Sequence, residues 1–200
     1  MWALVESNNV TQVFTRPKGI TIGEVNYPSN IFMLWSSSEL EAIGIYEVVV
    51  DNTNLKDEKY YINTDQSFAF ASGTVTASYG TATAKPLDDV LFTAQDETDG
   101  LGTEGEVKQS GIRQGHIDTI NGQAASNLAP TDWMVVRAAE GGTAVPSSIT
   151  TKRAAVRTKA NAMCTQITNA ANVDALAALY EYNDAEPPVR PLGEFPTPPE

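Results

Sequence analysis

A single apolar stripe runs along the C-terminal third of the chain and restricts what that third can become. Its members recur at spacings of seven, four, three, four and three residues: Ile149, Val156, Ala160, Met163, Ile167 and Ala170. An α-helix turns once in about 3.6 residues, so these spacings place all six side chains on one face of about six helical turns. Pro146 is expected to open this helix, with Ser148 as its N-cap. A second short helix is predicted from Val173 to Tyr182.

The first 86 residues have a different pattern, in which short runs rich in β-branched and aromatic residues alternate with turn residues. Such runs predict strands over residues 3–5, 10–14, 45–50, 59–63, 67–71 and 74–84. Ser7-Asn8-Asn9 supplies the first turn, because Asn tolerates positive φ. Ser38 and Glu41 fit a capping box for a short helix over 39–43, with Gly44 just beyond its end. Residues 1–86 are therefore predicted to form an antiparallel, β-rich N-terminal domain.

The middle of the chain is acidic and rich in glycine. Residues 87–106 lack the Asp-x-Asp-x-Asp-Gly spacing of a calcium loop, and we interpret them as a solvated linker. Residues 107–127 predict a helix that three glycines weaken, so that either a broken helix or one packed closely on a neighbour is expected. The fold class is α+β: the β-rich domain, this linker, a helical region over 107–185, and an extended proline-rich tail over 186–200.

Charge and composition restrict the classes of partner. The 200 residues carry 13 basic and 25 acidic side chains, a formal net charge of -12. This balance disfavours nucleic acid and anionic membranes, which bind clustered Lys and Arg. No run approaches the roughly 18 apolar residues of a membrane span, and the N-terminus has no basic region of the signal-peptide kind. We therefore expect synthesis and folding in a cytoplasm.

The chemistry-bearing residues do not form a recognisable catalytic motif. His116 is the sole histidine and Cys164 the sole cysteine, and no Gly-x-Ser-x-Gly or phosphate-binding glycine motif occurs. His116 is expected at the surface, and Cys164 as a half-buried structural thiol. The carboxylate pairs Asp88-Asp89 and Asp96-Glu97 lie in the glycine-rich stretch, a poor support for glycoside hydrolysis. The sequence thus predicts a protein without enzymatic activity, cofactor or metal.

A basic cluster stands out on this acidic chain. Lys152, Arg153, Arg157 and Lys159 fall within eight positions, and no acid occurs between Glu140 and Asp174. The cluster forms either a solvated helix face or a surface that meets an acidic stretch of another copy, such as residues 96–106. The tail either hangs free or lies across a neighbouring subunit through two apolar residues. The predicted partner-binding residues are Lys152, Arg153, Arg157, Lys159, Leu192 and Phe195.

One segment carries a family resemblance. Leu128-Ala129-Pro130-Thr131-Asp132-Trp133 is followed by Arg137, Glu140-Gly141-Gly142, Val145-Pro146, Arg153 and Arg157. This resembles a pattern of phage tail-fibre and tail-fibre-assembly proteins, in which Thr-Asp-Trp precedes a polar turn, a proline and an arginine-bearing helix. The residues over 154–156 depart from it. In this interpretation Trp133 is a structural residue that fills a core, and Pro146 opens the helix that packs on it. Tyr27-Pro28 and residues 35–44 also resemble the start of phage virion proteins.

The resemblance implies a role in assembly. The expected function is that of a non-enzymatic structural protein of a phage tail or tail fibre, present in the virion as a homo-oligomer and made in the cytoplasm of the host bacterium. Its partners are then other tail or fibre proteins. The alternatives are a tail-fibre assembly chaperone and a glycan-processing tail enzyme.

Overall fold

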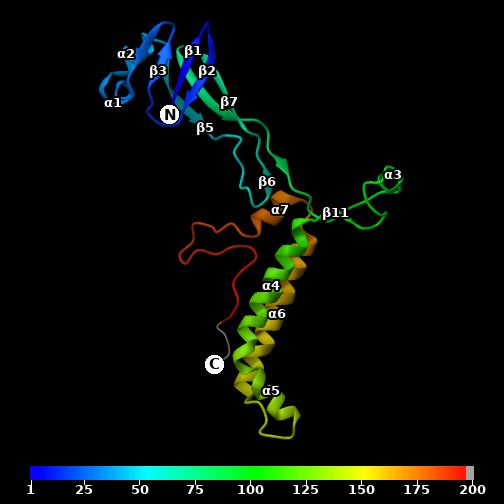
Figure 1. Ribbon diagram of the computed structural model, residues 1–200. Coiled ribbons are helices and arrows are strands. Elements are labelled where there is room, and N and C mark those ends of the chain that lie inside the picture. Colours follow the sequence, from blue (N-terminus) through cyan, green and yellow to red (C-terminus); the bar gives the residue numbers. More distant parts are fainter. Residues whose placement is uncertain (197–200) are drawn as a thin grey trace. The chain divides into compact units, whose positions relative to one another are not determined.

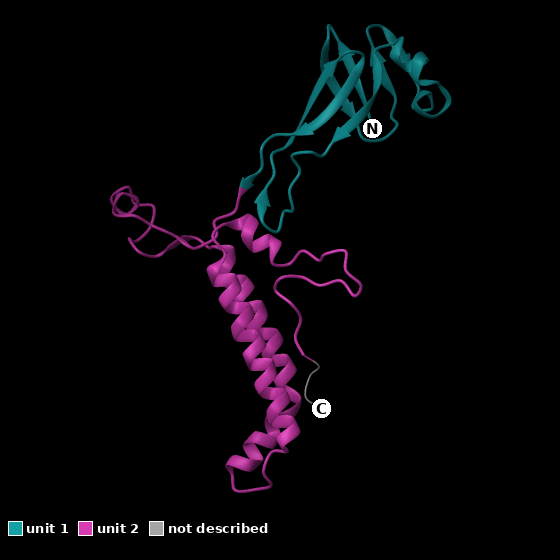
Figure 2. Ribbon diagram, turned by 180° about the vertical axis from the view of Figure 1, so that it is seen from behind, with its two compact units in different colours: residues 1–83 teal, residues 84–200 magenta. Residues whose placement is uncertain are grey.

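The computed structural model describes residues 1–196 and has an α+β fold, as the sequence predicts. Strands dominate the first half of the chain and long helices the second (Figure 1). The chain divides into two compact units, Met1–Thr83 and Ala84–Glu200 (Figure 2). The expected boundary lay after residue 86.

Unit 1 is built on a five-stranded sheet whose strand order is β2-β1-β5-β8-β7. The strand bounds are Trp2–Glu6 (β1), Asn9–Phe14 (β2), Ile45–Asp51 (β5), Gln66–Ala71 (β7) and Thr74–Tyr79 (β8). The N-terminal part is β-rich, as predicted, and three of the four strand pairs in this sheet are antiparallel. The fourth pair, β5 with β8, is parallel, from Val48 opposite Val75 to Asp51 opposite Ser78. Strands β7 and β8 form an antiparallel hairpin, and its second strand, β8, lies beside β5. Because β8 runs in the same direction as β5, this pair is parallel.

Two features of the backbone fix the connections in this sheet. Ser7 and Asn8 both have positive φ, 50° and 68°, at the turn between β1 and β2, which confirms the predicted use of Asn. Gly44, at φ +83°, precedes β5, and a Cβ there would lie 2.9 Å from the carbonyl oxygen of Val5. Glycine at this position therefore permits both the left-handed backbone and the close approach to β1.

One face of the sheet carries the larger core of unit 1. A hairpin of β3 (Ile20–Ile22) and β4 (Val25–Tyr27), which sequence reasoning missed, contributes to this core with α1 (Ile31–Leu34) and α2 (Ser37–Glu41). The buried members are Leu4, Phe14, Ile20, Ile31, Phe32, Leu40 and Ile45. The opposite face buries the smaller set Ala3, Val48, Val75 and Ala77. Alternate residues of one strand thus enter two separate cores.

The capping box of α2 forms two residues earlier than predicted. Ser36 is the N-cap, its hydroxyl accepts from the backbone N–H of Glu39, and the Glu39 carboxylate accepts from the Ser36 backbone at 2.8 Å. The backbone N–H of Ser36, followed by its hydroxyl, holds the pKa of Glu39 below its usual value. The prediction of Ser38 with Glu41 was wrong because Ser38 already lies inside the helix.

Unit 2 is organised by a helical hairpin of α4 (Ile112–Leu128) and α6 (Ser147–Asn169), which lie side by side in both views (Figures 1 and 2). A 3-10 turn (Ala129–Thr131) and α5 (Asp132–Ala139) connect them, and α7 (Val173–Ala178) follows. All six residues of the predicted stripe are buried. Helix α6 begins at Ser147 with Pro146 at the N-cap position, so the expected cap at Ser148 was wrong.

The helix expected over 107–127 is present only from Ile112 onward, and it is unbroken. Gly115 and Gly122 face open space, where a Cβ would have nothing within 4 Å. Residues 107–109 instead form a strand, β11 (Val107–Gln109), which pairs with β10 (Val90–Leu91). We call residues 88–109 the arm.

The arm is a folded element: residues 87–106 are largely exposed, as expected of a solvated stretch, but they also contain strand β10 and helix α3. Helix α3 (Ala94–Thr98) lies between its two strands and begins with a capping box of Thr93 and Asp96. Lys108 of β11 forms an ion pair with Asp96 at 2.6 Å. The ring of Phe92 lies where a Cβ on Gly102 would stand, and Lys108 lies over the same ring at 5.7 Å.

Candidate functional site

Leu128, Thr131 and Asp132 all accept hydrogen bonds from the largely buried guanidinium of Arg153. This group donates from Nη1 to the carbonyl oxygen of Leu128 at 2.8 Å and to the hydroxyl of Thr131 at 2.6 Å. From Nη2 it donates to Asp132 at 2.7 Å. The Arg153 side chain is 11% exposed and Thr131 is 1% exposed. Arg153 therefore closes the C-terminal end of α4 and is a structural residue, which corrects its prediction as a partner-binding residue.

Two further predicted partner-binding residues, Leu192 of the tail and Lys159 of α6, form contacts within the chain. Leu192 is fully buried, and its N–H donates to the carbonyl oxygen of Leu179 at 3.0 Å. Lys159 donates from Nζ to the Leu192 carbonyl at 2.8 Å. The described part of the tail thus docks on unit 2 of its own chain through Leu192 instead of hanging free, and a contact of the tail with a neighbouring subunit stays a prediction. Phe195 is half-buried, and residues 197–200 of the predicted tail lie outside the described residues.

Lys152 and Arg157 are the two predicted residues that stay exposed on α6. Among residues 1–196, no acidic side chain forms an ion pair with either of them. Arg157 lines a cavity of about 270 Å³ together with Val135, Val145, Thr150 and Arg153. Small-molecule sites usually measure roughly 300–1,000 Å³. This cavity lies just below that range, and its lining combines apolar side chains with two guanidinium groups.

Trp133 does not fill a core, so its predicted structural role was wrong. Its side chain is 55% exposed on α5, and the guanidinium of Arg137 lies 4.7 Å from the ring centroid. Val135 and Val136 are also exposed, at 41% and 55%. Tryptophan is highly buried on average, and valine is among the residues most often fully buried, so the sequence alone does not indicate that these three side chains are exposed.

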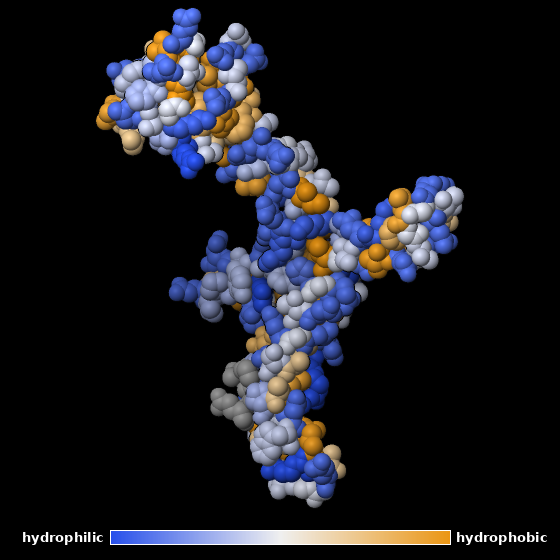
Figure 3. Space-filling view, viewed as in Figure 1, coloured by the Kyte–Doolittle hydropathy of each residue, from blue (hydrophilic) through white to orange (hydrophobic). Residues whose placement is uncertain are grey.

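We define the hairpin end as Trp133, Val135, Val136, Lys152 and Arg157. It combines exposed apolar side chains from α5 with two exposed cations from the first turns of α6. Figure 3 shows hydrophobic and hydrophilic surface interleaved at the end of unit 2 that carries α5. Exposed Trp beside apolar and Arg side chains is typical of the centre of a protein interface.

Arg113 binds the C-terminal end of α6, as Arg153 binds the C-terminal end of α4. It donates to the carbonyl oxygens of Ile167 at 2.7 Å and Ala170 at 3.1 Å, at the C-terminal end of α6. It also pairs with Asp88 of the arm, and this hydrogen bond holds the pKa of Asp88 below its usual value. Sequence reasoning missed Arg113, because its role becomes visible only when the pairing of the two helices is known.

The sole histidine and cysteine serve packing. His116 was expected at the surface, but it is half-buried and its Nδ1 lies 2.8 Å from the hydroxyl of Tyr180. Cys164 is half-buried, as predicted, and burial raises the pKa of its thiol. Among residues 1–196, no three His, Cys, Asp or Glu side chains group in a way that suits a metal ion.

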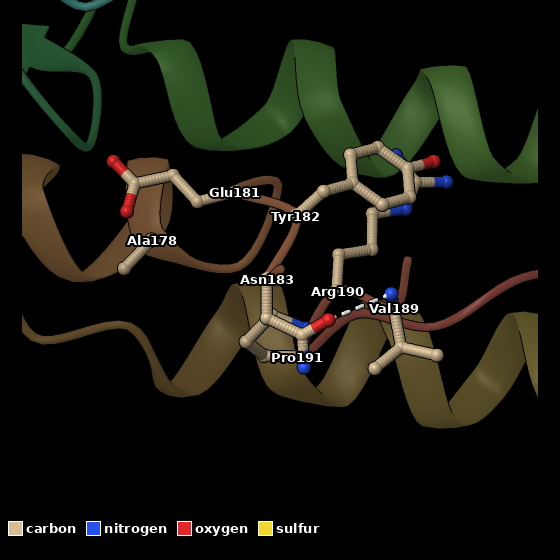
Figure 4. A pocket seen from close by; sticks show the side chains of 7 residues that line it. All are labelled: Ala178, Glu181, Tyr182, Asn183, Val189, Arg190 and Pro191. Carbon is tan, nitrogen blue, oxygen red and sulfur yellow. Dashed lines mark hydrogen bonds between the residues drawn. The ribbon is translucent and has the colours of Figure 1, made fainter. Parts of the chain in front are cut away.

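A second pocket, of about 590 Å³, lies where the tail leaves α7 (Figure 4). Its polar lining is engaged in holding the tail: Asn183 accepts from the N–H of Val189 at 3.0 Å, and Arg190 pairs with Glu194 at 2.7 Å. Tyr182 donates to Glu194 at 2.6 Å, which lowers the pKa of that carboxyl and raises the pKa of Tyr182. Glu181 is the one carboxylate among the seven lining residues, so the pocket lacks the paired acids that glycoside hydrolysis requires.

No protein-family model, curated protein or solved structure matches the chain. Within residues 1–196, no helix is both long and apolar enough to cross a membrane.

Proposed function

We propose that this chain is a non-enzymatic structural protein of a bacteriophage tail or tail fibre that acts through protein–protein assembly. It would be made in the cytoplasm of the host bacterium and reside in the virion, where its partners are copies of itself and other tail or fibre proteins. The observation that carries the proposal is the hairpin end. The segment that resembles phage tail proteins presents exposed apolar side chains there, instead of burying them.

Exposure of Trp133, Val135 and Val136 to water is unfavourable. Burying a side chain such as Trp or Val is favourable by about 1.5–3 kcal/mol, so three of them exposed together favour association. The network of Arg153 holds the segment that carries them, with hydrogen bonds to the end of α4 and the start of α5. A fixed apolar surface loses little conformational entropy when a partner covers it. This favours a permanent assembly role.

The test is the protein content of purified particles of the phage that encodes the chain. Quantitative mass spectrometry should find the chain in a fixed ratio to known tail proteins, and antibody labelling in electron micrographs should place it on the tail. Presence in infected cells with absence from purified particles would contradict the proposal. That result would favour the tail-fibre assembly chaperone, the second function that the resemblance implies.

A further inference from the structure

We infer that the arm of one copy docks on the hairpin end of another copy, so that the chain assembles head to tail. This inference deepens the proposed assembly role by naming the partner and the two surfaces, and it rests on that role. The two surfaces are the arm, residues 88–109, and the hairpin end as defined above.

The arm is acidic and carries apolar side chains that its own fold leaves uncovered. It contains seven acids and one base, Lys108, a net charge of -6: Asp88, Asp89, Asp96, Glu97, Asp99, Glu104 and Glu106. Leu101 is 61% exposed and Leu91 is 48% exposed. Val90 and Val107, on the paired strands, are 42% and 48% exposed. Figure 3 shows hydrophobic patches among hydrophilic surface on the arm.

The hairpin end has the complementary character. Residues 132–159 contain five bases and two acids, a net charge of +3, on a chain whose total is -12. Arg153 is already paired with Asp132, whereas Arg157 is exposed and stands at a cavity walled by Val135 and Val145. Leu101, with Asp99 and Glu104 close to it in the chain, presents an apolar side chain flanked by carboxylates. That is the combination that the cavity fits.

The connectivity of unit 2 makes this contact intermolecular. The arm ends at β11, immediately before α4, whereas α5 follows the far end of α4 (Figure 1). Helix α4 has 17 residues, and at about 1.5 Å per residue this separates the two surfaces by about 25 Å along the hairpin. Because the arm and the hairpin end lie apart on one chain, the arm of one copy would bind the hairpin end of another copy. Such a contact is heterologous and builds a ring or an open filament.

Charge makes the contact sensitive to salt. Raising the salt concentration from about 0.01 M to about 1 M shortens the Debye length from about 30 Å to about 3 Å. We expect self-association of the full-length chain, measured by sedimentation velocity over a range of concentrations, to weaken at least about tenfold. A contact made by apolar burial alone would not weaken in this way, because burial is not screened.

Charge reversal tests the pairing itself. The first variant, Lys152→Glu with Arg157→Glu, changes the net charge of residues 132–159 from +3 to -1. The second variant reverses four acids of the arm and changes its net charge from -6 to +2: Glu97→Lys, Asp99→Lys, Glu104→Lys and Glu106→Lys. Each variant alone carries like charges on both surfaces, so each should associate at least about tenfold more weakly than the unmodified chain. When the two are mixed, every arm meets an end of opposite charge, and association should return.

A matched control reverses two exposed acids of unit 1, Glu24→Lys with Glu41→Lys, and should associate as the unmodified chain does. Circular dichroism and a monomer sedimentation coefficient verify that each variant is folded. A chain that is monomeric at every concentration, or a mixture that fails to restore association, would overturn the inference. If the mixture restores association but purified particles lack the chain, the docking contact stands and the virion role fails. If particles contain the chain and the mixture does not associate, the virion role stands and the partner is another protein.

Discussion

Two arginines close the helical hairpin by the same device. Arg113 of α4 donates to the last carbonyl groups of α6, and Arg153 of α6 donates to the last carbonyl group of α4. The final carbonyls of a helix have no partner inside it and carry partial negative charge, so a cation there is favourable. The planar guanidinium also supplies several donors in a fixed geometry, which a lysine cannot reproduce. Each helix thus caps its neighbour.

Replacing Arg153 tests this device. Arg153→Met keeps much of the apolar stem but removes the hydrogen bonds to Leu128, Thr131 and Asp132, and it leaves the buried Thr131 hydroxyl with fewer partners. Charge-assisted hydrogen bonds contribute about 1.5–3 kcal/mol each, and Asp132 is largely exposed, so we expect a loss of about 2–3 kcal/mol. Urea unfolding of dilute protein, followed by the helical circular dichroism signal, measures it. The control Arg157→Met removes an exposed arginine of the same helix and should change the free energy of unfolding by less than about 0.5 kcal/mol.

Leu192 anchors the tail and supports a second prediction. Its side chain is fully buried, and its backbone bonds to Leu179 and Lys159. Leu192→Ala should weaken tail docking by about 2–4 kcal/mol, because truncation removes buried methyl groups and leaves a cavity. Hydrogen exchange over residues 183–195 should then accelerate, while α4 keeps its protection. Val189→Ala, at a residue that is 53% exposed, is the control, and equal exchange in both variants would refute the anchor.

At the scale of elements, the arm depends on one carboxylate. Lys108 and the Thr93 cap together hold the pKa of Asp96 at about 2, below its ordinary value of 3.8. A depressed carboxyl pKa stabilises the arm fully above pH 3.8, and this contribution is lost as the pH falls through about 2. Amide resonances of residues 93–108 should therefore keep their folded shifts at about pH 3 and lose them near pH 2.

The variant Asp96→Asn provides the check on this assignment. It cannot ionise, so the arm should be loosened at neutral pH and should show no further transition in the same acid range. A wild-type arm that opens near pH 4 would mean that another carboxyl controls it.

The elements that sequence could predict are those whose signal is local. The stripe from Ile149 to Ala170 predicted α6, since one face of a helix must be apolar for the helix to bury it. The turn at Asn8 followed in the same way from its tolerance of positive φ. In these cases a few neighbouring residues contain the cause, and the structure agrees.

The arm shows why other elements were missed. Its capping box, Thr93 with Asp96, has the recognised spacing, but its strands are two and three residues long, and their pairing spans the intervening loop. Phe92 is covered by Gly102 and Lys108, a contact that composition cannot show. The candidate site was half predicted for the same reason: Lys152 and Arg157 are exposed, whereas Arg153 and Lys159 found partners 25 and 33 residues away.

At the scale of the whole molecule, the two units have cores of their own. Both core clusters of unit 1 are built from residues before Ala84, and the α6 stripe is packed within unit 2. Units of 83 and 117 residues are each large enough for an independent core, although the smaller is near the marginal range. We therefore expect fragments 1–83 and 84–200 to fold separately, the first with a strand-type and the second with a helix-type circular dichroism spectrum.

The same two fragments show which unit is responsible for self-association. Both surfaces of the inferred head-to-tail contact, the arm and the hairpin end, lie in fragment 84–200, so this fragment alone should self-associate with the salt dependence of the full chain. Fragment 1–83 contains neither surface and should sediment as a monomer at concentrations where the other assembles. If association instead followed fragment 1–83, the exposed Met33 and Leu34 of its α1, at 70% and 74%, would be the apolar surface to test, and the assembly would run through unit 1.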